Sequence, residues 1–237
     1  MKRTIIIMAK VPRAGNVKTR LQPFLSSEEC RALAEAFLFD AINKVRKVCD
    51  ELVIAFAPSD EKNYFDRFET CGDLILIEQK GADLGERMAS AFEFAVSADL
   101  GKAIVMIGTD SPTFPIEFAE QAFSDLETRA EIVLGKSDDG GFYLIGLKKI
   151  FSTLFDGIEW SSAKVFEQIT ANVEKLKISR FELISGWYDV DTFTDLRRLR
   201  DEFSDAKAAR KNAPATYRWT LENAGIFERN VQLQAGK

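Results

Sequence analysis

The sequence predicts an α/β protein of three layers, in which a doubly wound, mainly parallel sheet is covered by helices on both faces. Two observations predict this fold. Short runs that are apolar throughout alternate with amphipathic stretches, as buried parallel strands alternate with crossover helices. Apolar residues make up 46% of the 237 residues, which is enough for a sizeable core. We expect one domain over residues 1–204 and a peripheral C-terminal extension at 205–237, where the sequence is polar and weakly patterned.

The order of these runs gives the expected elements. Strands are expected at 3–9, 51–57, 73–79, 102–110, 130–136, 142–147 and 175–183. Helices are expected at 26–48, 60–68, 84–98, 115–128 and 161–173, with a last helix that starts near Thr192. The sequence SDDGG at 137–141 separates two apolar runs, and its DG and GG pairs predict a tight hairpin turn.

The composition excludes several kinds of function. The chain has no histidine, so catalysis and metal binding that depend on histidine are excluded. A net charge of −5 argues against a general nucleic-acid binder. Three widely spaced cysteines predict idle thiols. No apolar run is long enough for a membrane span, and the apolar start is too short for a signal peptide, so a cytoplasmic location is expected.

The segment AKVPRAGNVKTRL, at residues 9–21, is basic in an acidic protein. The first 27 residues carry six positive charges, and the first acid of the chain is Glu28. The segment follows the first expected strand, and ligands of such sheets bind at the carboxyl ends of the strands. It matches neither GxxxxGK[ST] nor GxGxxG. It therefore predicts a cradle for phosphate, with a solvated basic loop as the alternative.

Two acidic segments are expected at the same edge of the sheet. Asp110, in GTDSP, closes a strand and would bind a divalent cation that bridges phosphate oxygens; the alternative is a turn ahead of Ser-Pro. DVDT places Asp189 and Asp191 just before a helix. There the alternative is a helix cap, because Thr192 with Asp195 resembles a capping box.

Three further segments are candidates for the substrate side. The glycines of SDDGG would let a substrate approach the backbone closely. Trp160 of WSS would form the wall of a pocket, whereas Ser161 or Ser162 would serve as a helix N-cap. GADLGERM, at 81–88, places two glycines ahead of a helix, either as a turn that faces a nucleotide or as a simple helix start.

These motifs, in this order, resemble a bacterial family described as glycosyltransferases and also as a domain of unknown function. The resemblance covers roughly residues 3 to 200 and includes AKVPRAGNVKTRL, DLGERM, GTDSP, DDGGFYLIGL, WSS and DVDTFTDL. It implies the nucleotide-diphospho-sugar transferase fold of GT-A type. A similar KTRL loop occurs in 2-phospholactate guanylyltransferases and related nucleotidyltransferases, so the resemblance implies a nucleotide ligand and leaves two reactions open.

The resemblance also implies roles for individual residues. The nucleotide would be bound by Lys10, Gly15, Lys18, Arg20, Gly85, Arg87 and Asp110. A divalent cation, Mg²⁺ or Mn²⁺, would lie on Asp110 and Asp191. The sugar or acceptor would contact Asp139, Gly140, Gly141, Trp160 and Ser161. Lys18, Arg20 and Asp139 are the expected catalytic residues: the cations would neutralise the leaving group, and Asp139 would orient or deprotonate the acceptor.

Three functions are compatible with this set. The first is a metal-dependent transferase that uses a nucleotide-diphospho-sugar donor. The second is a nucleotidyltransferase that joins a nucleoside monophosphate to a phosphorylated acceptor and releases pyrophosphate; the absence of a second acid after Asp110, where DxD is common, leaves room for it. The third is a non-catalytic nucleotide-sugar binding protein. All three expect a nucleotide ligand, and the two transferases expect a small-molecule acceptor as well.

Overall fold

Seven strands form one sheet, in the order β3-β2-β1-β4-β6-β5-β7. The structure is a computed structural model that describes residues 1–71 and 73–228. β6 pairs antiparallel with both of its neighbours, whereas the other strand pairs are parallel, so the expected mainly parallel sheet is confirmed. The strands are β1 (Arg3–Lys10), β2 (Glu51–Ala57), β3 (Ile75–Glu78), β4 (Ala103–Ile107), β5 (Ile132–Ser137), β6 (Phe142–Leu147) and β7 (Phe181–Trp187).

The single reversal of the sheet comes from the turn between β5 and β6. Gly140 has a φ of 91°, a left-handed conformation that glycine adopts at little cost. The amide of Ser137 donates to the carbonyl of Gly141 over 3.0 Å and closes the turn. The expected hairpin is therefore present. Because β6 runs backwards, its first residues lie at the edge where the other strands end.

Helices cover both faces of the sheet. α1, α3 and the 3-10 helix η2 pack on one face, and α2 and α4 pack on the other. The expected three layers are thus confirmed. The helical bounds are η1 (Thr19–Leu21), α1 (Ser27–Val45), η2 (Ser59–Cys71), α2 (Leu84–Ser97), α3 (Ile116–Thr128), α4 (Val165–Lys175), α5 (Phe193–Glu202), α6 (Ala206–Asn212) and α7 (Pro214–Glu222).

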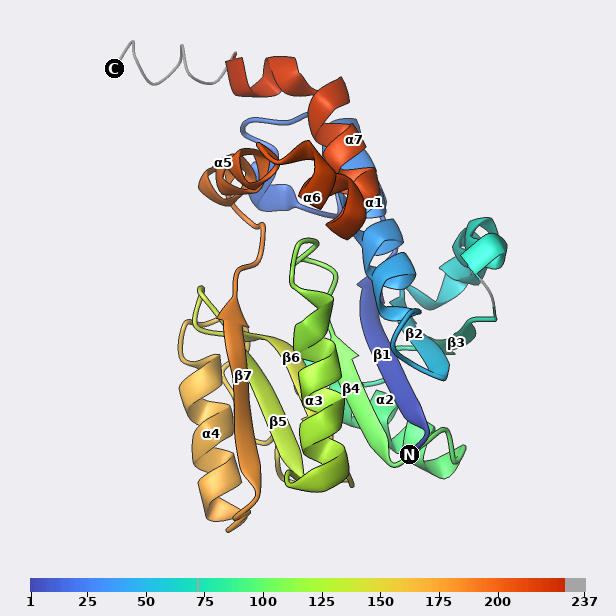
Figure 1. Ribbon diagram of the computed structural model, residues 1–237, viewed down its shortest axis with the longest axis vertical. Coiled ribbons are helices and arrows are strands. Elements are labelled where there is room, and N and C mark those ends of the chain that lie inside the picture. The colour runs from blue at the N-terminus through green and yellow to red at the C-terminus, as the bar shows by residue number, and fades with distance from the viewer. Residues whose placement is uncertain (72, 229–237) are drawn as a thin grey trace.

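The C-terminal helices pack against α1 beyond the carboxyl end of the sheet (Figure 1). α5, α6 and α7 share a buried apolar cluster with the N-terminal half of α1. The carboxylate of Asp40, on α1, accepts hydrogen bonds from the amides of Ala215 and Thr216 at the start of α7, over 2.9 and 2.7 Å. The expected extension therefore contains α6 and α7 and is tied to α1, whereas residues 229–237 lie outside the described part of the chain.

The last strand differs from its expected position. β7 begins at Phe181, because α4 continues to Lys175 and Lys177 then turns with a φ of 53°. The apolar residues at 176 and 178 pack on the core from this turn, so their alternation imitates a strand. Within the described residues, no helix combines the length and apolar character that a membrane crossing needs.

Candidate active site

Two adjoining cavities form one cleft at the edge where β1 and β4 end. The larger one, of about 650 Å³, is called the basic compartment. Its lining includes residues that the smaller cavity lacks: Lys10, Asn16, Val17, Lys18, Thr19 and Gln79. The smaller one, of about 460 Å³, is called the apolar compartment after six residues that line it and not the larger one: Met88, Met106, Ile145, Trp160, Ala163 and Val165. Two polar residues, Asp139 and Ser162, also line this compartment alone. Arg20, Asp110, Asp189 and Asp191 line both compartments, so they mark the junction.

The basic loop after β1 folds back on itself at the mouth of the cleft. The Lys10 ammonium donates to the carbonyl of Asn16 over 2.6 Å, which closes the loop. Lys18 has a φ of 48°, in the left-handed region that residues other than glycine seldom adopt. Such a conformation costs free energy and persists only where surrounding contacts impose it. The contacts of the Lys18 side chain supply that constraint.

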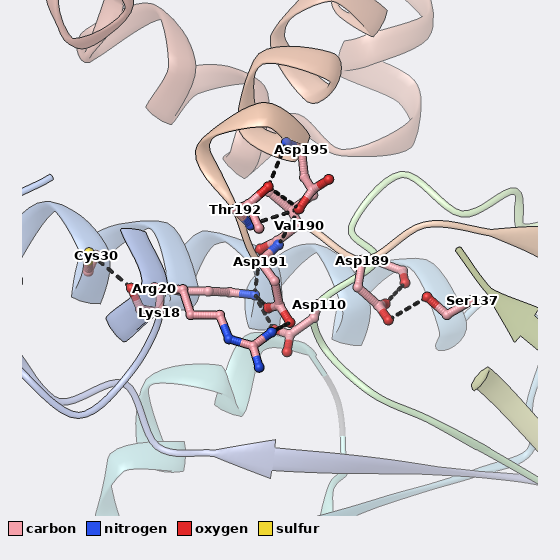
Figure 2. Close-up of polar contacts among 11 residues, drawn as sticks. Lys18, Arg20, Cys30, Asp110, Ser137, Asp189, Val190, Asp191, Thr192 and Asp195 are labelled. Atoms are coloured by element: carbon pink, nitrogen blue, oxygen red, sulfur yellow. Dashed lines mark hydrogen bonds and ion pairs between the residues drawn. The ribbon is translucent and has the colours of Figure 1, made fainter. Parts of the chain in front are cut away.

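Lys18 lies at the centre of the junction (Figure 2). Its Nζ atom is 2.5 Å from a carboxylate oxygen of Asp110, 3.3 Å from one of Asp191 and 2.9 Å from the carbonyl oxygen of Val190. These three oxygens engage the three donors of the ammonium. Only 5% of the side chain is exposed, and Nζ also lies 5.0 Å from the centre of the Phe37 ring. Lys18 therefore holds two carboxylates in place and has no donor left for a phosphate.

The electrostatics of this cluster favour a charged lysine. Burial alone would lower the pKa of Lys18, because the charged form loses its hydration. The negative charges of Asp110 and Asp191 outweigh that effect, so the pKa of Lys18 is raised above its ordinary value. The ammonium is accordingly a permanent part of the site near neutral pH.

The loop after Asp110 is held from its outer side by two side chains. The buried Lys44 ammonium, on α1, donates to the carbonyls of Pro112 and Phe114 over 2.6 and 2.8 Å. The Asn212 amide, on α6, donates to the carbonyl of Thr113 over 2.8 Å. Side chains of α1 and α6 thus hold the carbonyls of residues 112–114. These contacts fix the loop from its outer side, and Asp110 lies on the side of the cleft.

Asp189 lies deeper in the same edge. It accepts hydrogen bonds from the hydroxyl of Ser137, over 2.7 Å, and from the hydroxyl of Ser111. Burial raises the pKa of Asp189 to about 6, with the charges of Asp110 and Asp139 adding to the rise and the two hydroxyls opposing it. Ser111, the residue after Asp110, has a hydroxyl that is engaged by Asp189. The loop after β4 therefore presents one carboxylate to the junction, that of Asp110.

Arg20 is the cation at the junction that is best placed to meet a ligand. Its side chain is 66% exposed, and its ion pair with Asp191, at 3.5 Å, is long. An exposed pair of this kind holds its partners weakly. Arg20 can therefore turn from Asp191 to a phosphate group, which a guanidinium binds in a bidentate manner.

The apolar compartment is closed on one side by Trp160. A Cβ atom added to Gly85 would lie 2.8 Å from Cζ2 of Trp160, so the absence of a side chain on α2 lets the indole pack directly on the helix. The Trp160 ring also packs against Phe142 and Phe155, with ring centres 6.5 Å apart in both cases. The next residue, Ser161, has a φ of 67° and lines both compartments.

The predicted site residues fall into two groups. The first group lines the cleft and consists of Lys10, Lys18, Arg20, Asp110, Asp139, Gly141, Trp160, Ser161 and Asp191. The second group does not line the cleft, but each member is next in sequence to a residue that does: Gly15, Gly85, Arg87 and Gly140. Among these, Arg87 donates to the carbonyl of Gly81 over 3.1 Å and thereby holds the loop before α2.

The capping box that was the alternative for the second acidic segment is present. The cap of α5 is a capping box made by Thr192 and Asp195, so the helix start does not use the carboxylates of Asp189 and Asp191. Those carboxylates face Ser111, Ser137, Lys18 and Arg20 instead. The cap and the site are adjacent but separate.

The pair Asp110 and Asp191 could hold a divalent cation that arrives with a phosphate. Both carboxylates meet at Lys18 and remain partly exposed, at 48% and 34%. Among the described residues, no group of three or more acidic, cysteine or histidine side chains is placed to hold a metal ion. Mg²⁺ commonly uses one or two carboxylates together with substrate phosphates and water, so two carboxylates suffice for such a site.

Sequence reasoning missed the part that Asp189 and the side chains around it play at the junction. The sequence singles out Asp189 only as a neighbour of Asp191, although its position after a strand carries the same signal. Lys44 and Asn212 carry no local signal, because they act on a loop that is distant in the sequence. Met106 and Ile145 have the pattern of core residues of strands, and they also line the apolar compartment.

The sheet order, the single reversed strand and the cleft at the carboxyl edge define a protein with the nucleotide-diphospho-sugar transferase fold. The chain belongs to a bacterial family described as "Uncharacterized protein conserved in bacteria (DUF2064)", whose model matches residues 41–162, more than half of the chain. The resemblance found in the sequence is therefore confirmed.

The structure is similar to a crystal structure of a "putative nucleotide-diphospho-sugar transferase" from Desulfovibrio desulfuricans G20. The two chains are 29% identical, with a TM-score of 0.86, and the match covers 97% of this chain and 98% of that one. A nucleotidyl transferase from Methanothermobacter thermautotrophicus shares the fold, with a TM-score of 0.53 at 12% identity; that match covers 85% of this chain and 97% of the other.

Two curated relatives are 2-phospho-L-lactate guanylyltransferases. The one from Methanothermobacter thermautotrophicus is 26% identical over 80% of this chain and 81% of its own length. The one from Methanobrevibacter smithii is 30% identical, but that match spans only 43% of either chain. The enzyme class expected from the sequence, a transferase, is the class that these relatives carry.

Proposed function

We propose that this protein is a nucleotidyltransferase that joins a nucleoside monophosphate to a phosphorylated acceptor and releases pyrophosphate. The observation that carries the proposal is the meeting of Asp110 and Asp191 at the Lys18 ammonium. The two carboxylates come from different strand ends and replace the paired acids of a DxD segment. The names of the curated relatives support the same reaction, since both are guanylyltransferases.

The basic compartment is the proposed site of the triphosphate. Arg20 and Lys10 are its exposed cations, and Lys10 keeps two of its three donors after it bonds to Asn16. Lys18 acts indirectly, because it fixes the two carboxylates. Preorganised charge of this kind stabilises a transition state without reorganisation at the moment of reaction.

The reaction then needs little proton transfer. An oxygen of the acceptor phosphate attacks the α-phosphorus, the bond from the α-phosphorus to the bridging oxygen breaks, and pyrophosphate leaves. A phosphate is already ionised near pH 7, so no general base is required. A divalent cation, when bound by Asp110 and Asp191, would neutralise charge on the phosphate oxygens.

Sugar transfer from a nucleotide-diphospho-sugar is the second candidate. The observation that favours it is Asp139, which lines the apolar compartment and could orient an acceptor hydroxyl. Its carboxylate, however, accepts the Gly141 amide over 2.9 Å within the hairpin turn, so a structural role explains its position equally well. The likeness to the Desulfovibrio protein, named for nucleotide-diphospho-sugars, also keeps this candidate open.

Ligand-dependent thermal unfolding tests the proposal. Each nucleoside triphosphate and each common nucleotide sugar is added with Mg²⁺ or Mn²⁺, because a ligand that binds only the folded state raises the melting temperature. We expect the largest shift with a triphosphate, and a much smaller shift in the variant Arg20→Ala. A shift with nucleotide sugars but with no triphosphate would overturn the proposal in favour of sugar transfer.

A further inference from the structure

We infer that the acceptor is a phosphomonoester whose organic part is apolar and carries no negative charge. This inference rests on the proposed nucleotidyl transfer and adds the chemical class of its second substrate. It comes from the contrast between the two compartments of the cleft, which differ in polarity and in charge.

The walls of the apolar compartment are suited to a hydrophobic group. Met88, Met106, Ile145 and Val165 are buried side chains that line it from α2, β4, β6 and α4. Trp160 forms a further wall and is fixed by its packing on Gly85. The cavity of about 460 Å³ has room for an organic group larger than a three-carbon unit.

The charges around this compartment disfavour an anionic organic part. Among its described lining residues, Arg20 is the single cation, and it lies at the junction with the basic compartment. The other charged lining residues are carboxylates: Asp110, Asp139, Asp189 and Asp191. A phosphate at the junction can bind Arg20, but a second anionic group further inside would meet the Asp139 carboxylate and no cation among the described lining residues.

The geometry therefore assigns the two ends of the acceptor. Its phosphate lies at the junction, where an oxygen can attack the α-phosphorus of the nucleotide. The new bond joins that oxygen to the α-phosphorus, and the bond to the departing pyrophosphate breaks, so no oxidant or further reactant is needed. The organic part extends away from the triphosphate, toward Trp160.

This assignment separates the protein from its curated relatives. Those relatives are named for 2-phospho-L-lactate, an acceptor whose phosphate and carboxylate are both anionic. Isopropyl phosphate is the same molecule with a methyl group in place of the carboxylate. The pair therefore isolates the effect of one negative charge, and phenyl phosphate adds apolar surface.

Calorimetric titration with these three compounds tests the inference. The protein is kept in Mg²⁺ with each non-hydrolysable nucleoside triphosphate analogue in turn. We expect phenyl phosphate to bind at least about tenfold more tightly than 2-phospho-L-lactate, with isopropyl phosphate between them. The reverse order, equal affinities or no binding of any of the three would overturn the inference.

Two variants test whether charge and the indole wall set this preference. Ala163 is exposed and lines the apolar compartment, so Ala163→Arg adds a cation there with little risk to folding. It should shift the preference toward 2-phospho-L-lactate by about tenfold, whereas the control Leu221→Arg, at an exposed position of α7, should not. Trp160→Ala should weaken phenyl phosphate more than isopropyl phosphate. If Ala163→Arg left the preference unchanged, the charge argument would be wrong.

Pyrophosphate release distinguishes failure of this inference from failure of the proposed function. Release with 2-phospho-L-lactate alone would keep nucleotidyl transfer and overturn the apolar acceptor. If the three compounds bound in the expected order but no triphosphate gave pyrophosphate, the preference of the compartment would stand and nucleotidyl transfer would be overturned.

Discussion

Lys18 and Asp191 are separated by 173 residues in the sequence, and their Nζ and Oδ1 atoms lie 3.3 Å apart. The same ammonium contacts Asp110, so one buried cation joins the loop after β1 to the segments that follow β4 and β7. This contact organises the site, because it brings both carboxylates of the proposed metal site to one point.

Lys18→Met tests this organising role. The variant keeps the length of the side chain but leaves two carboxylates facing each other without a cation. Loss of one preorganised charged group typically lowers turnover by about 100-fold or more, and we expect a loss of this size. Turnover and the melting temperature are measured together, with Lys149→Met, in an exposed ion pair with Glu131, as the control. Unchanged turnover in Lys18→Met would contradict the role.

Arg20→Ala separates ligand binding from stability. Arg20 is exposed, and its long ion pair should contribute at most about 1 kcal/mol to the free energy of unfolding. A charge-assisted hydrogen bond to phosphate is worth about 1.5–3 kcal/mol, so the KM for triphosphate should rise by roughly 10- to 100-fold. Arg180→Ala, which removes another exposed arginine whose ion pair is long, 3.6 Å from Glu131, should change neither quantity appreciably. Similar KM values for both variants would place the phosphates elsewhere.

Gly85→Ala tests the support beneath Trp160. The new methyl group would lie 2.8 Å from Cζ2 of Trp160 and 3.2 Å from Cβ of Phe155, so the indole must move. We expect a loss of about 1–3 kcal/mol in the free energy of unfolding, as for other overpacked cores. The KM for the acceptor should rise while the KM for the nucleotide stays the same. An equal rise in both KM values would show that the indole does not belong to the acceptor side alone.

Lys44 gives a prediction about pH. Burial lowers the pKa of Lys44 from 10.5 to about 7, although the nearby Asp40 opposes that shift. The unfolded chain therefore binds more protons than the folded chain between about pH 7 and 10.5, so this group makes the free energy of unfolding rise with pH in that window. Lys44→Met should flatten the rise, measured by urea unfolding at several pH values. A steeper rise in the variant would contradict the prediction.

The fold and the location of the site follow from the sequence because both depend on regular patterns. Apolar runs alternating with helices predict parallel strands, and parallel strands bring their carboxyl ends to one edge. That rule alone is sufficient to place Asp110, Asp191 and the basic loop together. The hairpin at 137–141 follows in the same way from its glycines.

The details of the site depend on contacts between distant segments, which a single sequence does not reveal. The sequence predicts phosphate binding by Lys18, but the donors of that side chain are engaged by Asp110, Asp191 and Val190. It also predicts Gly85 near the nucleotide, whereas Gly85 lies under Trp160 and does not line the cleft. In both cases the role is set by a partner that is distant in the sequence.

The identity of the released product tests nucleotidyl transfer most directly. The protein is incubated with Mg²⁺, each nucleoside triphosphate and phenyl phosphate or 2-phospho-L-lactate, and in parallel with nucleotide sugars and the same acceptors without triphosphate. We expect pyrophosphate in equal amount to the triphosphate consumed, and release that is about 100-fold slower or more in Lys18→Met. Release of a nucleoside diphosphate from a nucleotide sugar, with no pyrophosphate from any triphosphate, would contradict nucleotidyl transfer.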